Sequence, residues 1–220
     1  ETILLRRGDE WSDELHLTGD GTAGNPVTLA DYGPSSLPRP KISRNDVEYD
    51  KCVVVSNASH WVIHDLDLRH AKIGLYLCYI QDYDNTNIVV YDCHVEDLPD
   101  DTLDPEKHNY QLAWSYGIFV GGSAGGFVGS PLNTYTVLDG LVVSNCTFLR
   151  CAGGFGIAWY YPLPLYDRVR NITMTDCVAD QCIMGAFGMS DINHTRIERV
   201  RGIHGGGVDT WCGSTLAMVQ

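Results

Sequence analysis

The chain has 220 residues, a formal net charge of −13 and an isoelectric point near 4.8. This acidity argues against unaided nucleic-acid binding, which relies on Lys and Arg against phosphate, and it makes a polyanionic sugar an awkward ligand unless a divalent cation mediates. No apolar run reaches the length that spans a bilayer, and 23 Gly with 9 Pro mark a turn-rich, all-β chain.

The first fifty residues are predicted to form short strands between Gly and Asp turns, making roughly one and a half coils of a solenoid. Four segments have this character: Thr2–Arg7, Glu14–Thr18, Pro26–Ala30 and Pro40–Ser43.

One sequence pattern recurs from residue 60 onward. It is clearest in Gly140–Cys151 and Asn171–Cys182, whose apolar positions match one to one. Three weaker copies are His60–Leu68, Asn87–Val95 and Thr195–Val200. Most copies start roughly 25 to 30 residues apart and alternate as strands do, which indicates a solenoid of stacked coils. We expect an all-β, right-handed parallel β-helix of about six to eight coils.

A single β-helix domain is therefore expected over residues 1–220. Its opening coils would occupy residues 1–50, regular coils residues 51–98 and 139–220, and insertions residues 99–138. Because a solenoid needs capped ends and neither terminus supplies a cap, we expect a longer chain or an assembly, including a possible homopolymer through the ends.

The opening segments carry a family resemblance. Leu5–Trp11, Gly21–Gly33 and Arg39–Ile42 resemble the opening coils of secreted right-handed parallel β-helix proteins. That superfamily includes pectate lyases, polygalacturonases, and alginate and chondroitin lyases. The resemblance implies an extracellular, carbohydrate-active protein, and it specifies fold far better than chemistry.

Three insertions interrupt the repeat. Pro99–Trp114 is polar, Gly121–Leu138 is rich in Gly, and Trp159–Asp167 is aromatic. Long loops on a solenoid usually lie on one flank and often form its binding face, so these segments are expected to wall one groove.

Most cysteines are predicted to be buried thiols. The repeat places five of the eight in two inward stacks: Cys93, Cys146 and Cys177 in one, and Cys151 and Cys182 in the other. The first stack continues the slot of Leu66, so these residues are expected to act as small apolar side chains, although neighbours within a stack could pair if oxidised.

Polar residues recur at the register just before this slot. Asp65, Asp92, Asn145 and Asp176 share it, and we expect a turn ladder that caps backbone amides rather than a metal site.

Strand alternation predicts a charged patch on the outer surface. Asp67 and Arg69 project outward from one coil and His94 and Glu96 from the next, so Asp67 lies beside His94 and Arg69 beside Glu96. The following coil brings uncharged residues, and the patch is expected to end there. Either these residues carry chemistry or they are solvated cross-strand charge pairs.

If the chain cleaves glycans, His94 with Asp67 is predicted as the proton-transfer pair, and Glu96 or Asp101 as the second carboxylate. Arg69 or a loop-bound Ca²⁺ would stabilise charge. Candidate Ca²⁺ ligands in the first insertion are Asp100, Asp101 and Asp104. The alternative is an acidic loop that only adds solubility.

The insertions also carry candidate sugar-binding aromatic residues: Tyr110, Trp114, Trp159 and Tyr160. Flat rings suit the apolar faces of sugars, and the alternative is that these loops pack back on the coil. Candidate glycosylation sites are Asn57, Asn145, Asn171 and Asn193, each in an Asn-x-Ser/Thr triplet that Asn in turns and Thr in strands also produce cheaply.

The resulting hypothesis is an extracellular polysaccharide-interacting β-helix protein, a glycoside hydrolase or polysaccharide lyase by resemblance. The alternatives are a non-catalytic glycosylated subunit of a filament or cell-surface assembly, and a sugar-binding adhesin. Neither a nucleic-acid partner nor a membrane span is expected.

Overall fold

The structure is a computed structural model. It describes ten segments of the chain: residues 1–45, 50–79, 84–98, 115–121, 137–157, 169–182, 185–190, 192–204, 208–211 and 216–219. Within these segments the secondary structure consists of strands and turns and contains no helix.

The strands form three parallel sheets, which we name A, B and C. Sheet A contains β1 (Thr2–Arg6), β4 (Val27–Tyr32), β7 (Trp61–His64), β10 (Asp84–Tyr91), β13 (Val137–Ser144), β16 (Val169–Thr175) with β19 (Ile192–Asn193), β20 (Thr195–Glu198) and β23 (Leu216–Val219). Sheet B contains β2 (Glu10–Trp11), β5 (Lys41–Ser43), β8 (Asp67–Arg69), β11 (His94–Glu96), β14 (Thr147–Leu149), β17 (Val178–Asp180) and β21 (Arg201–Ile203). Sheet C contains β3 (Leu15–Thr18), β6 (Lys51–Ser56), β9 (Ile73–Cys78), β12 (Tyr116–Gly121), β15 (Gly153–Ile157), β18 (Gly185–Ser190) and β22 (Val208–Trp211).

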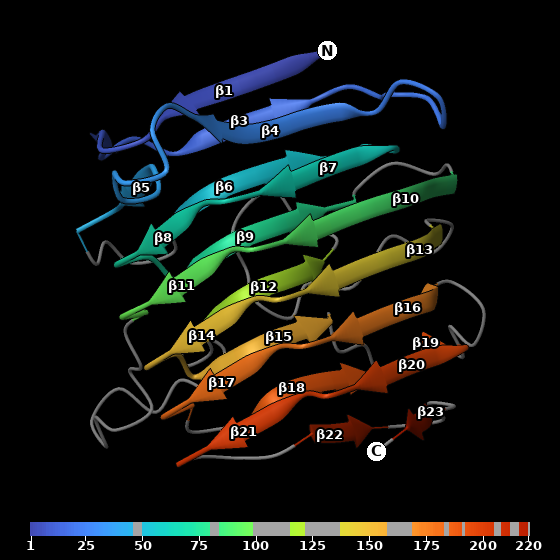
Figure 1. Cartoon of the computed structure of the whole chain (residues 1–220). Coiled ribbons are helices and arrows are strands. Elements are labelled where there is room, and N and C mark those ends of the chain that lie inside the picture. The colour runs from blue at the N-terminus through green and yellow to red at the C-terminus, as the bar shows by residue number, and fades with distance from the viewer. Residues whose placement is uncertain are drawn as a thin grey trace.

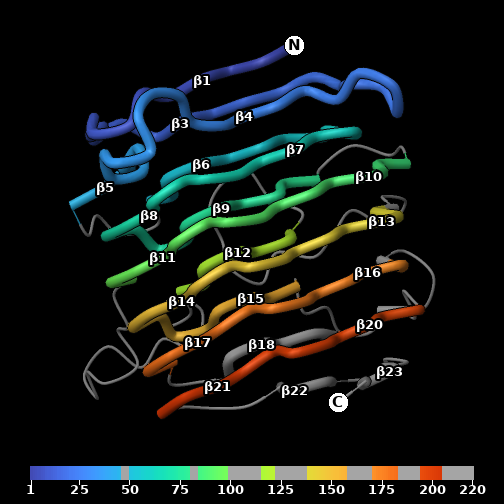
Figure 2. Tube along the Cα trace, viewed as in Figure 1, coloured from blue at the N-terminus to red at the C-terminus, as the bar shows by residue number. Residues whose placement is uncertain are grey.

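The chain visits sheets A, B and C in turn and then repeats the circuit one layer further along. Figure 1 shows these layers stacked from the N-terminal to the C-terminal end, and the tube in Figure 2 shows equivalent strands of successive coils lying side by side. Sheets B and C each have seven strands in the described part of the chain, which corresponds to seven coils. The prediction of a right-handed parallel β-helix with six to eight coils is confirmed.

The corner between sheets A and B is a single residue in the left-handed conformation. Asp65, Asp92, Asn145, Asp176 and Arg199 have φ angles between 50° and 58°. Asp and Asn tolerate this region better than most residues. The amide N–H groups of the first four donate to a carbonyl of the next coil, as from Asn145 to Thr175 at 3.0 Å. The predicted ladder of turn residues is present, but the side-chain hydrogen bonds that the structure gives for it run to other side chains, such as that from Asn145 to Asp92, and not to the backbone amides expected from the sequence.

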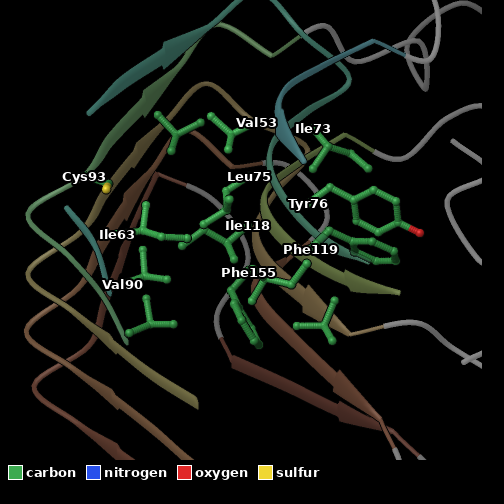
Figure 3. Packing of buried hydrophobic residues seen from close by; sticks show 14 of the residues in the cluster. Val53, Ile63, Ile73, Leu75, Tyr76, Val90, Cys93, Ile118, Phe119 and Phe155 are labelled. Carbon is green, nitrogen blue, oxygen red and sulfur yellow. The ribbon is translucent and has the colours of Figure 1, made fainter. Parts of the chain in front are cut away.

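The core lies inside the triangular coil. Ile63 and Val90 of sheet A face Leu75, Ile118 and Phe155 of sheet C across the interior (Figure 3). Alternate residues of each strand point inward, so every coil adds one apolar layer to those below it. Burial of these layers is the main stabilising contribution to the fold.

The cysteine stacks lie in this core as predicted. Cys93, Cys146 and Cys177 are buried, and each thiol donates to the carbonyl two residues earlier at 3.3 to 3.4 Å. Cys151 and Cys182 form the second buried stack. All seven described cysteines are free thiols. A small residue with a weak donor fits this slot because it fills the corner and also pairs a turn carbonyl.

The middle strands of sheet C, β6, β9, β12 and β15, are buried on both faces. Tyr76 and Phe119 point away from the interior (Figure 3), yet they are only 1% and 2% exposed. The rings of Tyr116 and Phe119 stack with centroids 5.0 Å apart. Consecutive apolar residues in these strands are typical of a strand buried on both sides. The outer faces of sheets A and B are more exposed, and the candidate site is therefore sought there.

Gly117 illustrates how tightly the coils pack at the entry to sheet C. A Cβ atom there would overlap the ring of Phe148 and lie 2.6 Å from the carbonyl oxygen of Gly154. Gly24 provides the contrast, because a Cβ atom at that position would meet nothing within 4 Å.

Gly117→Ala is therefore expected to lower the free energy of unfolding by about 1 to 3 kcal/mol, because the added methyl group must displace a core ring and a backbone carbonyl. Gly24→Ala is the matched control and should change stability little. Urea unfolding followed by circular dichroism would measure both. Equal unfolding midpoints for the two variants would contradict the tight packing described around Gly117.

Candidate functional site

The outer face of sheet B carries the predicted charged patch. Strand pairing puts His94 opposite Asp67 and Glu96 opposite Arg69, as alternation predicted. The residues between them, Leu68 and Val95, point into the core and are buried, which fixes the direction of the polar side chains.

Arg69 joins the two coils. It binds Asp67 through two hydrogen bonds, Nε to Oδ1 at 2.7 Å and Nη2 to Oδ2 at 3.0 Å, and its Nη1 lies 2.8 Å from Oε2 of Glu96. The hydrogen bonds to Asp67 raise the pKa of Arg69. Its guanidinium group is thus engaged by two carboxylates.

His94 is held by Glu96 on its own strand. Its Nε2 lies 3.0 Å from Oε2 of Glu96. The sequence predicted Asp67 as the partner of His94, but the hydrogen bond that the structure gives to this imidazole runs to Glu96, while both oxygens of Asp67 bind Arg69. Residues two apart on a strand share a face, so Glu96 can reach His94 as readily as Asp67 on the neighbouring strand can.

Arg150 extends the patch one coil further than expected. It follows β14 at a left-handed corner with φ 52°, and its guanidinium group contacts Glu96 and Asp97. Sequence reasoning missed it because only the alternating strand positions were followed. The signal was the corner register itself, which Asp97 and Arg150 share. We refer to the resulting cluster as the ion network: Asp67, Arg69, His94, Glu96, Asp97 and Arg150.

The network lowers the pKa values of two of its carboxylates, Glu96 and Asp97. Burial raises the pKa of Glu96, but the hydrogen bonds from His94 and Arg150 and the charge of Arg69 outweigh it, so the net shift of that pKa is downward. The hydrogen bond from Arg150 lowers the pKa of Asp97. Carboxylates of this kind suit a base or a charge stabiliser at neutral pH and do not suit a proton donor.

The geometry leaves His94 as the group that can move a proton. An ionised carboxylate only accepts hydrogen bonds, so Glu96 favours the tautomer in which Nε2 carries the proton. Nδ1 is then the ring nitrogen that can take up a proton. Glu96 would also stabilise the imidazolium that forms, in the manner of an orienting carboxylate beside a general base.

A second cluster lies at the corner of sheets A and B nearer the N-terminus. Potential metal-ligating atoms of Asp31, His64 and Asp65 lie within 4.8 Å of one another. The guanidinium group of Arg7 contacts Asp31 and lies 3.3 Å from Asp65, so a cation from the protein already balances these carboxylates. His64 stacks on Tyr91 with ring centroids 4.5 Å apart. This cluster ties the first coil to the next three.

Seven predicted site residues lie outside the described part of the chain: Asp100, Asp101, Asp104, Tyr110, Trp114, Trp159 and Tyr160. Their roles in Ca²⁺ and sugar binding stay predictions.

The predicted glycosylation sites differ in exposure. Asn145 and Asn171 are exposed, and the side-chain amide of Asn171 donates to Asp139 at 2.6 Å. Asn57 is half-buried, and Asn193 belongs to the short strand β19.

No family model and no curated protein sequence matches this chain. Its fold is similar to that of a GH136 lacto-N-biosidase from Eubacterium ramulus, with a TM-score of 0.74 and 14% identity, over 99% of this chain and 45% of that one. It is also similar to an alginate lyase from Paenibacillus sp. str. FPU-7, with a TM-score of 0.53 and 15% identity, over 92% of this chain and 69% of the lyase.

This chain thus spans less than half the length of the lacto-N-biosidase. At such low identity the likeness shows the fold, a parallel β-helix, and nothing about the reaction. In the described part of the chain, no helix has the length and apolar character needed to cross a membrane.

The lowered pKa of Glu96 makes the contribution of this residue to stability depend on pH. Because the pKa is lower in the folded state, the contribution is fully present above the unfolded pKa and is lost as pH falls through the folded one. The difference in unfolding free energy between wild type and Glu96→Gln should be largest above about pH 5 and should shrink toward pH 3.

Denaturant unfolding of both proteins across this range is the measurement. Glu14→Gln makes the same chemical change outside the ion network and serves as control. A difference between wild type and Glu96→Gln that stays constant with pH would contradict the network as described.

Proposed function

We propose that this protein binds a glycan along the outer face of sheet B and cleaves it, as a glycoside hydrolase or a polysaccharide lyase, with His94 transferring the proton. The observation that carries the proposal is the imidazole of His94, whose side chain faces outward from its strand and lies 3.0 Å from Glu96, a carboxylate that also contacts Arg69 and Arg150.

The fold supports a glycan as the substrate class. Two solved structures with this architecture are described as a lacto-N-biosidase and an alginate lyase, which act on different glycans by different reactions. A long face of stacked parallel strands offers an extended polymer the same backbone frame at every coil.

The residues of the ion network have different roles in the proposed reaction. His94 takes or gives the proton, and Glu96 orients its ring and stabilises the imidazolium. Arg69 and Arg150 balance negative charge that develops on the sugar oxygen. Asp67 fixes Arg69, so it is a positioning residue in this scheme rather than the partner of His94.

The proposed function also includes the Ca²⁺ site and the sugar-binding aromatic residues that the sequence predicts in the insertions. Ca²⁺ would be held by carboxylates of residues 99–114, and the aromatic residues of the insertions would form the sugar platforms. An extracellular location, occupied glycosylation sites and polymerisation through the coil ends also belong to it.

A second candidate function follows from the way the carboxylates of the ion network are paired with arginines of the same network. Asp67, Glu96 and Asp97 each contact an arginine without any ligand, which also suits a non-catalytic coil of a structural or sugar-binding protein. The same experiments separate the two functions.

His94→Ala is expected to lower cleavage by about 100-fold or more, because general acid–base groups typically contribute that much. The measurement is release of reducing ends, and of unsaturated sugars by absorbance, from a panel that includes alginate, polygalacturonate and lacto-N-biose-containing glycans.

His204→Ala is the matched control, since His204 also lies beside sheet B with a ring nitrogen 3.0 Å from an acidic side chain, Asp180. It should keep the wild-type rate. Glycan binding without cleavage by wild type would favour the non-catalytic function, and an unchanged rate in His94→Ala would remove His94 from the mechanism.

Removal of Ca²⁺ with EGTA is expected to reduce cleavage or binding, and added CaCl₂ should restore it, because hard cations bind clustered carboxylates through oxygen. Replacing Asp100, Asp101 and Asp104 together by Asn should reproduce the effect of EGTA. Full activity in EGTA would rule out the Ca²⁺ part of the proposal.

A further inference from the structure

We infer that the ion network selects neutral glycans and rejects polyuronates, because Glu96 and Asp97 occupy the arginine positions that a uronate carboxylate would need. The inference rests on the proposed function in placing a glycan on the outer face of sheet B. It names the charge class of that glycan.

Both arginines of the network already contact two resident carboxylates each. A guanidinium group recognises a carboxylate best through two parallel N–H donors. Arg69 uses one such pair on Asp67, at 2.7 and 3.0 Å, and its remaining terminal nitrogen on Glu96 at 2.8 Å. Arg150 spans Glu96 and Asp97 with its Nη2 and Nε atoms. Three resident carboxylates thus share two arginines, so a uronate adds a further negative charge here unless it displaces one of them.

Displacement would be costly at Glu96. Its side chain is 12% exposed, while that of Arg150 is 43% exposed. If Arg150 turned toward a substrate carboxylate, Glu96 would lose a charged partner at a poorly solvated position, and a second negative charge would stand close to it. The site thus discriminates against a uronate by repulsion, because the uronate carboxylate would lie near resident carboxylates without a free cationic partner.

The coil of β5, beside β8, adds no unpaired cation that the structure shows for a uronate. Lys41 lies 2.7 Å from Glu10, and Arg44 lies 3.0 Å from Asp50, so these cations are paired with resident carboxylates as well. The chain as a whole carries a net charge of −13. A polyanion approaching this face therefore meets a charge-balanced surface on an acidic protein.

The charge of the glycan determines which reaction can cleave it. Elimination removes a proton made acidic by a neighbouring carboxylate group, and a neutral sugar has none. A neutral glycan on this face is therefore cleaved by hydrolysis, so the inference selects the hydrolase form of the proposed function.

The test is a gain of binding in the double variant Glu96→Gln with Asp97→Asn. Both changes remove charge and keep shape, and Asn is well tolerated at the left-handed corner of Asp97, where φ is 55°. Affinity for polygalacturonate and alginate oligomers, measured by isothermal titration calorimetry at low salt, should rise at least about tenfold, because charge-assisted hydrogen bonds to the two arginines become available. The gain should fall as salt is added.

The matched control is Asp139→Asn with Asp176→Asn, which makes the same change in net charge and removes a carboxylate partner from Arg170 and from Arg199 on other coils. It should leave polyuronate affinity at the wild-type level. The single variants Glu96→Gln and Asp97→Asn should each give part of the gain, which keeps the test valid if the double variant folds poorly.

Three results would overturn the inference: no gain in the Glu96/Asp97 variants, an equal gain in the control, or wild-type affinity for polyuronates as high as that of the variants. All three are read from binding. They are therefore distinguishable from failure of the proposed function, which is read from the absence of glycan cleavage.

Discussion

The in-register stacking of parallel strands governs every other feature of this molecule. Each residue has an equivalent residue about 4.8 Å above and below it. Inward positions therefore build continuous apolar columns, such as Leu66, Cys93, Cys146 and Cys177, and outward positions build columns of polar groups. Within the regular coils, a site draws on residues two apart along a strand, on corner residues, and on the adjacent coils.

The same stacking imposes charge balance on the surface. Two like charges at the spacing of neighbouring coils repel, so each carboxylate column needs cations beside it. The pair of Asp139 with Arg170 meets this need on sheet A, the pair of Asp176 with Arg199 meets it at the corner between sheets A and B, and the ion network meets it on sheet B. An ion pair on this surface is therefore weak evidence for a site. What sets the ion network apart is the imidazole of His94 within it.

The sequence was sufficient to predict the coils because two independent patterns agreed. Period-two alternation fixed which residues point inward, and the repeated cysteines fixed how successive coils align, so the pairing of His94 with Asp67 followed directly. The contacts of the site were less predictable. Alternation does not say whether His94 turns toward Asp67 or toward Glu96, which depends on side-chain length and on the competing bond from Arg69. Arg150 was missed because corner residues break the alternation.

The length of the strands in sheet B explains why chemistry can concentrate there. β8, β11 and β14 are three residues long, and each is followed by a corner residue that also points to solvent. Each coil thus presents two outward strand residues and one corner residue within a few ångströms, so two coils suffice for a base, an orienting carboxylate and a cation. The middle strands of sheet C, buried on both faces, cannot offer this arrangement. Because neighbouring coils tolerate different outward residues without changing the core, substitutions on a single coil can alter the charge of the face while the fold stays intact.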